Sequence, residues 1–99
     1  MTPADLIPKD FDLSEVEAER KAEWAGLPDE REAVADNPSV CGCAMSLTLA
    51  AEGFVEREVL TAPTVIARPD LYARAALAKA ILADLYQRLG ALDLPGEPS

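Results

Sequence analysis

The sequence predicts a mainly α protein, a small bundle or hairpin of three to four helices organised on residues 70–90. Leucine and alanine recur there at spacings of three and four, which places them on one face of a helix. Glycines and prolines fall between the predicted segments, where they end helices and form turns. With 99 residues, the chain forms one domain at most.

We divide this single domain, 1–99, into an extended arm, a helical core and a flexible tail. The arm, 1–11, contains two prolines and no hydrophobic period, the core spans 12–94, and the tail, 95–99, is rich in proline. Apolar residues make up 49 % of the chain, but many are alanines and only 5 % of residues are aromatic. Because so short a chain buries a modest core, we expect it to assemble with a second copy or another protein.

The first core segment is predicted to form a charged surface helix that begins at Ser14. Ser14 and Glu17 fit the S-x-x-E capping box, in which each side chain bonds a free backbone N–H at the helix start. The helix is expected to stop at Gly26. A short second helix follows from Pro28, a residue suited to a first turn, and ends before the turn signal at Asn37.

The middle third, residues 39–68, allows two interpretations. Ser39 can cap a helix that is apolar most of the way round and therefore central. The alternative is an α+β fold with a short β-hairpin in 43–68, because Met45–Ala50 alternates large apolar with small or polar residues. We prefer the helix, since Ala, Glu and Met favour it.

The last helix, 70–90, is the most strongly patterned segment of the chain. Asp70 is expected to cap its start and Gly90 to end it as a left-handed residue. Asp84 and Arg88, four residues apart, are expected to form a surface pair. We expect four of its leucines in the core: Leu71, Leu82, Leu85 and Leu89.

Charge is unevenly spread along the chain. Eighteen acidic against nine basic residues give a formal charge of −9, and residues 1–37 carry eleven of the acids and four of the bases. Such a field repels phosphates and anionic lipid, so direct binding to nucleic acid or a membrane is not expected. A solvated face is the simpler explanation of this acidity. The alternative is a contact for a basic protein surface, for which the candidates are Glu15, Glu19 and Glu23.

The start of the chain gives no sign of export. Met1–Phe11 lacks the basic start and apolar core of a signal peptide, and no apolar run reaches the roughly 18 residues of a membrane span. Two cysteines make no disulfide framework. We therefore expect a cytoplasmic protein of a bacterium, an archaeon or a phage-infected cell.

Little in the sequence indicates chemistry. Histidine is absent, which removes the commonest general base and metal ligand, and no phosphate-binding glycine loop occurs. We therefore predict no enzyme activity, no cofactor and no metal. Cys41-Gly42-Cys43 is a weak motif: two thiolates suit a soft metal or a strained disulfide, but a closed zinc site needs four ligands. Packing of two small apolar side chains is the preferred interpretation.

Three aromatic residues are candidate interface positions. Trp24 is expected to anchor the first helix to the 70–90 helix, or else to form an exposed contact. Tyr72 and Tyr86 lie two heptads apart with Lys79 midway, so they share one helical stripe. That stripe forms either a rim of the core or a contact strip for another subunit.

The preferred function is that of a small acidic non-catalytic interaction protein. It would be an accessory, adaptor or regulatory subunit that docks on a protein partner or self-assembles, as a homo-oligomer or a complex subunit. One alternative is an acidic inhibitor that imitates nucleic acid, such as a phage anti-defence protein. The other is a thiol metal or redox carrier acting through Cys41 and Cys43.

Overall fold

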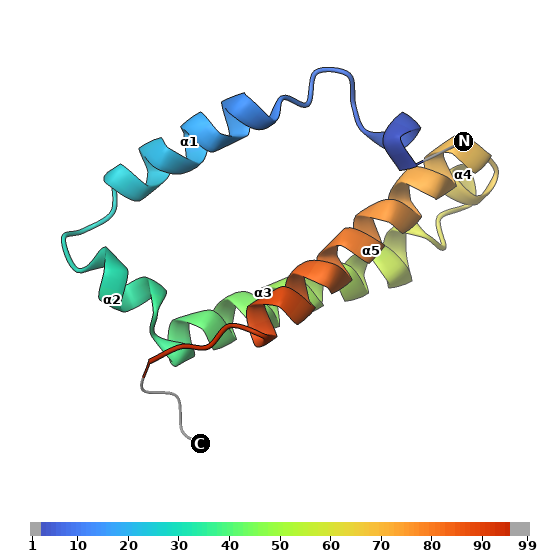
Figure 1. Cartoon of the computed structure of the whole chain (residues 1–99). Coiled ribbons are helices and arrows are strands. Elements are labelled where there is room, and N and C mark those ends of the chain that lie inside the picture. Colours follow the sequence, from blue (N-terminus) through green and yellow to red (C-terminus); the bar gives the residue numbers. More distant parts are fainter. Residues whose placement is uncertain (1–2, 96–99) are drawn as a thin grey trace.

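The computed structural model describes residues 3–95, in which every regular element is helical (Figure 1). The prediction of a mainly α protein is confirmed. The alternative β-hairpin in 43–68 is wrong, because those residues form helices joined by short turns. The elements in chain order are η1 (Pro3–Leu6), α1 (Leu13–Ala25), α2 (Arg31–Ala35), α3 (Pro38–Phe54), η2 (Val55–Val59), α4 (Pro63–Ile66) and α5 (Pro69–Gly90).

The two predicted terminal segments are described in part. Residues 1–2 of the arm and 96–99 of the tail lie outside the described residues. The rest of the arm is only partly extended, because η1 is one turn of 3-10 helix that packs against α5.

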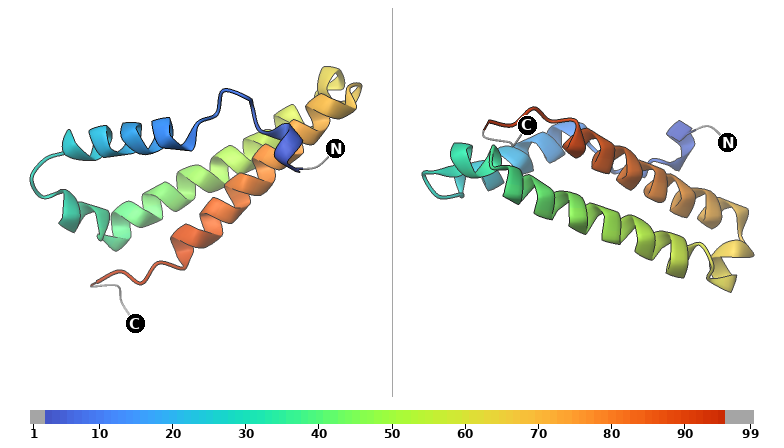
Figure 2. Two further views of the ribbon diagram at one scale, coloured as in Figure 1. Left: turned by 45° about the horizontal axis from the view of Figure 1, so that its top comes forward. Right: turned by 90° about the horizontal axis from the view of Figure 1, so that it is seen from below.

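A helical hairpin of α3 and α5 forms the main body of the molecule. The two helices lie side by side and antiparallel, and theirs is the most extensive packing between elements in the described chain (Figure 2). α3 continues directly into η2, a π-helical stretch closed by the hydrogen bond from the Leu60 N–H to the Val55 carbonyl (2.9 Å). The chain then reverses through α4 into α5.

α1 stands apart from this hairpin. Figure 1 shows it as the far side of an open loop that leaves α5 at η1 and returns through α2 to the start of α3. The described chain extends over 48 × 32 × 20 Å, with a radius of gyration of 16.7 Å. A compact chain of this length has a radius of gyration of about 13 Å. The chain as a whole is thus more open than a compact domain. The α3–α5 pair is packed, and the N-terminal third contacts the rest of the chain mainly at its two ends.

α1 is capped by Asp12 rather than by the predicted Ser14. The Asp12 carboxylate accepts hydrogen bonds from the Ser14 N–H (2.8 Å) and the Ser14 hydroxyl (2.7 Å), so the predicted Ser14 cap is wrong. These bonds favour the charged carboxylate and lower the pKa of Asp12 below its ordinary value. The helix ends at Gly26, as expected.

Proline shifts the start of the two long helices. Pro38 and Pro69 each occupy a first helical position, where a missing N–H costs nothing and the fixed φ suits the helix. The cap position therefore falls on the residue before each proline, Asn37 and Arg68, and the predicted Ser39 and Asp70 caps are wrong. The Asn37 side chain accepts from the N–H groups of Ser39 (2.8 Å) and Val40 (3.4 Å).

This cap assignment can be tested with two neighbouring alanine variants. We expect Asn37→Ala to lower the free energy of unfolding by about 1 kcal/mol, because two N–H groups lose their acceptor. Ser39→Ala should change it little, since Ser39 contributes its backbone N–H to the cap. Urea unfolding followed by circular dichroism measures both. A larger loss in Ser39→Ala would contradict the assignment.

The described side chains form no enclosed core: none of them is fully buried. Leu82 and Leu89 are half-buried, but Leu71 and Leu85 are 38 % and 44 % exposed, so their predicted core positions are wrong. The accessible surface is 7671 Å², against about 5500 Å² for a compact monomer of 10.6 kDa. The fold leaves much of its apolar surface in contact with solvent.

Candidate interaction surfaces

The inner surface between α5 and the continuous α3–η2 helix is held by a few specific contacts. The Cys41 thiol donates to the Leu89 carbonyl (3.5 Å), and the Lys79 ammonium pairs with the Glu56 carboxylate (3.2 Å). A side chain on Gly90 would begin 3.1 Å from the Met45 methyl group. Gly90 therefore permits close approach of the two helices. It lies within α5 rather than ending it as a left-handed residue, so the predicted role is wrong.

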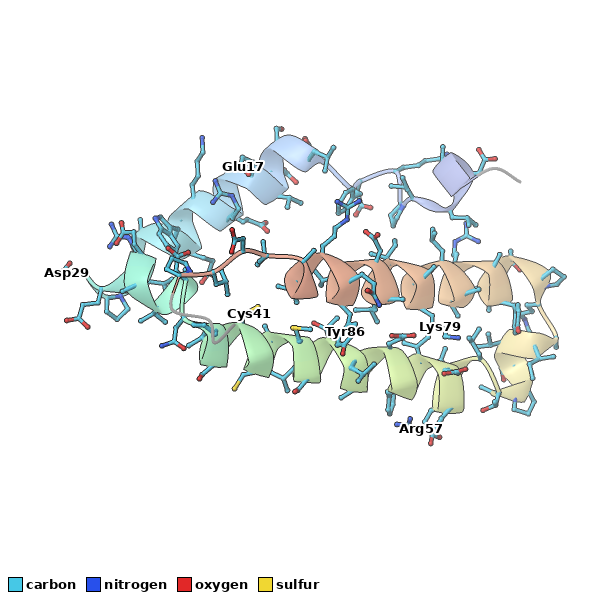
Figure 3. All side chains as sticks on the ribbon, turned by 60° about the horizontal axis from the view of Figure 1, so that its bottom comes forward. Glu17, Asp29, Cys41, Arg57, Lys79 and Tyr86 are labelled. Atoms are coloured by element: carbon cyan, nitrogen blue, oxygen red, sulfur yellow. The ribbon has the colours of Figure 1, made fainter. Side chains whose placement is uncertain are left out.

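The Tyr72–Lys79–Tyr86 stripe faces this inner surface. Figure 3 shows Lys79 and Tyr86 pointing from α5 toward α3, and Tyr86 is half-buried. Tyr72 is 43 % exposed and lines, with Lys79, a groove of about 420 Å³ beside Leu60. The stripe runs along the rim of the helical hairpin. This rotation of α5 turns Leu85 to one side of the contact with α3. Leu71 shares the helical face of Leu82 and Leu89 and is exposed near the start of the helix.

The opposite side of α3 is apolar and exposed, although Val40 at its start also lines a hollow beside Trp24. We call it the α3 outer face, and all of its members are exposed: Val40, Cys43, Leu47, Ala50 and Phe54. Leu47 is 72 % exposed and Phe54 58 %. The sequence predicts a helix that is apolar most of the way round and central in the fold, whereas in the structure one side of it is open. The seven-residue spacing of its large side chains was the signal for a second contact face.

The α3 outer face belongs to an unusually apolar helix. By length and composition alone, one helix of the described chain, the 22-residue stretch Pro38–Val59, is suited to crossing a membrane.

A second apolar surface lies where the arm meets α5. A groove of about 420 Å³ separates them, and its apolar lining includes Leu6, Ile7, Phe11, Leu77, Ala78 and Ile81. Ile81 is 58 % exposed, so the arm covers this side of α5 only in part. We call this feature the arm groove.

Trp24 packs locally rather than against α5. The Arg31 guanidinium lies 5.6 Å from the centre of its ring, and Leu27, Val34 and Val40 line the same hollow of about 280 Å³. Trp24 is half-buried there. The predicted anchor between α1 and the 70–90 helix is therefore wrong. Trp24 instead joins the end of α1 to α2 and the start of α3.

The acidic candidates lie along one side of α1. Glu15, Glu19 and Glu23 are exposed and succeed one another every four residues, or about 6 Å along the helix axis. Elsewhere on the same helix, Glu17 pairs with Arg20, which lowers the pKa of Glu17 through a hydrogen bond. The three glutamates thus form a continuous negative edge, available to a basic surface.

The two cysteines point in different directions. Residues two apart in an α-helix are separated by about 200° around its axis. Cys41 accordingly lies half-buried against α5, whereas Cys43 is exposed on the α3 outer face. In this geometry the two thiols neither share one metal ion nor close a disulfide with each other. No group of three or more metal-binding side chains occurs in the described part of the chain.

Comparisons with known proteins add no relative: no family model, no curated protein and no solved structure matches this chain.

Proposed function

We propose that this chain is a small acidic, non-catalytic interaction protein, an accessory, adaptor or regulatory subunit that completes its hydrophobic core by association. The observation that carries the proposal is the lack of any fully buried side chain among the described residues. Folded domains gain most of their stability from apolar burial, and large exposed apolar patches mark interaction sites. Both the α3 outer face and the arm groove have this character.

The distribution of polar groups supports the same proposal. The sequence has no histidine, and the ion pairs of Arg20, Arg74 and Arg88 are exposed pairs within single helices. Exposed pairs of this kind contribute little to stability. The negative edge of α1 would orient the chain toward a basic partner surface and raise the rate at which the two associate.

The proposal is tested on the isolated chain at low concentration. We expect about 1 µM chain to bind the dye ANS strongly and to unfold with low cooperativity, because its apolar faces are then uncovered. Raising the concentration, or adding a binding partner, should raise the unfolding midpoint by mass action.

The control is the same chain unfolded in guanidinium chloride, which has no clustered apolar surface for the dye. A dilute monomer that unfolds in one sharp transition, independent of concentration and without ANS binding, would overturn the proposal.

A further inference from the structure

We infer that the α3 outer face joins two copies of this chain, with their α3 helices antiparallel. The inference rests on the proposed function and names the partner that it leaves open: a second copy. It concerns the face made by Val40, Cys43, Leu47, Ala50 and Phe54.

Side-chain size along this face is suited to self-association. Val40, Leu47 and Phe54 recur every seven residues, and small residues, Cys43 and Ala50, lie between them. These are the a and d positions of a heptad. In an antiparallel pair an a residue lies opposite a d residue of the other helix. Leu47 then faces the second copy's Ala50, and Phe54 faces its Cys43, so the two largest side chains each meet a small one. In the same register Val40, at the end of the face, lies beside the second copy's Arg57.

The distribution of charge also favours this face for contact between two copies of the chain. Two copies with a formal charge of −9 each repel one another over most of their surface. Residues 38–51 contain no acidic or basic residue, so α3 offers 14 consecutive neutral positions. Most acids of 1–37 lie on α1, on α2 and in the turn between them, a part of the molecule that stands apart from the hairpin (Figure 1). Two chains therefore meet along α3 without bringing those charges together.

The chain exposes more surface than a compact monomer, as is expected of one subunit of a dimer. Each chain exposes 7671 Å², about 2200 Å² more than a compact monomer of its mass. A standard protein interface covers about 800 Å² on each partner. A contact along α3 thus accounts for part of the excess and leaves the arm groove on the other side of the hairpin free.

Light scattering after size exclusion tests the dimer. At about 100 µM we expect wild-type chain to elute at about 21 kDa, twice the 10.6 kDa chain. Leu47→Asp should raise the dimer dissociation constant about 100-fold or more, because it places a charge at the centre of the contact. Leu13→Asp is the matched control: Leu13 is 73 % exposed, against 72 % for Leu47, but lies on α1. It should leave the dimer intact.

Cysteine cross-linking tests the orientation. In a Cys41→Ser background, Phe54→Cys should form an intermolecular disulfide with the second copy's Cys43 under mild oxidation. Cys43 alone should not cross-link, because its two copies lie about 16 Å apart along an antiparallel pair. Efficient cross-linking through Cys43 alone, or none in Phe54→Cys, would overturn the antiparallel arrangement.

Other outcomes separate this inference from the proposed function. A dimer that survives Leu47→Asp overturns the α3 contact. A monomer at about 100 µM that binds ANS overturns self-association but leaves the proposed interaction protein intact. A sharply unfolding monomer without ANS binding overturns both. Co-flotation with phosphatidylcholine vesicles, abolished by Leu47→Asp, would assign the face to a membrane and overturn the dimer.

Discussion

Tyr86→Ala is expected to lower the free energy of unfolding by about 2 kcal/mol, measured by urea unfolding at fixed chain concentration. Tyr86 points from α5 into the contact with α3 and is half-buried there (Figure 3). Removing its ring exposes apolar surface on both helices. The loss should be smaller than the roughly 3–5 kcal/mol of a fully buried aromatic, because part of the ring is already in water.

Tyr72→Ala is the matched control for this prediction. It removes the same side chain from the same helical stripe, but Tyr72 is 43 % exposed and lies near the start of α5. We expect less than half the effect of Tyr86→Ala. Equal losses for the two variants would show that helix propensity, rather than packing against α3, determines the effect.

Trp24 fluorescence is expected to report an unfolding transition at lower urea than circular dichroism does. Trp24 is the single tryptophan of the chain and lies in the hollow that joins α1 to α2. α1 is held by this local cluster, whereas α3 and α5 pack along most of their length. Regions with little apolar packing open at a lower free energy than the packed regions of the same protein. Dichroism follows mainly α3 and α5, which hold most of the helical residues.

Arg31→Ala separates the two transitions further. Its guanidinium lies over the Trp24 ring and donates to the Leu27 carbonyl (3.4 Å), so its loss weakens this cluster by about 1 kcal/mol. The fluorescence midpoint should fall while the dichroism midpoint stays. Coincident transitions in the wild type, or a parallel shift of both in Arg31→Ala, would show that α1 unfolds together with the hairpin.

Both apolar faces of α3 matter for the function that we propose. One face contacts α5 through Cys41 and Met45, which accounts for the thiol bond to Leu89 and the close approach at Gly90. The other face carries Leu47 and is open. A helix that is apolar on both sides is typical of an interior element. In this chain α5 covers only one of the two sides, which is why we propose that a second molecule covers the other.

Features that depend on neighbours in the chain could be predicted from the sequence. The helical character of 70–90, the end of α1 at Gly26 and the exposed Asp84–Arg88 pair (2.7 Å) all follow from interactions within a few residues. Glu15, Glu19 and Glu23, the candidates for a basic contact, are exposed on α1. The caps at Asn37 and Arg68 could not be predicted in this way. A polar residue follows each proline and is itself a plausible cap, whereas in the structure the proline begins the helix.

The faces that meet were decided only by the tertiary structure. Periodicity identifies an apolar stripe but not the partner to which it turns, so Leu71 and Leu85 were expected inside and lie outside. Trp24 was expected against the last helix, yet the open path of α1 leaves it among α2 and the start of α3. These outcomes depend on the rotation of α5 about its axis and on the direction of α1. Both are set by contacts between residues far apart in sequence, which local patterns do not encode.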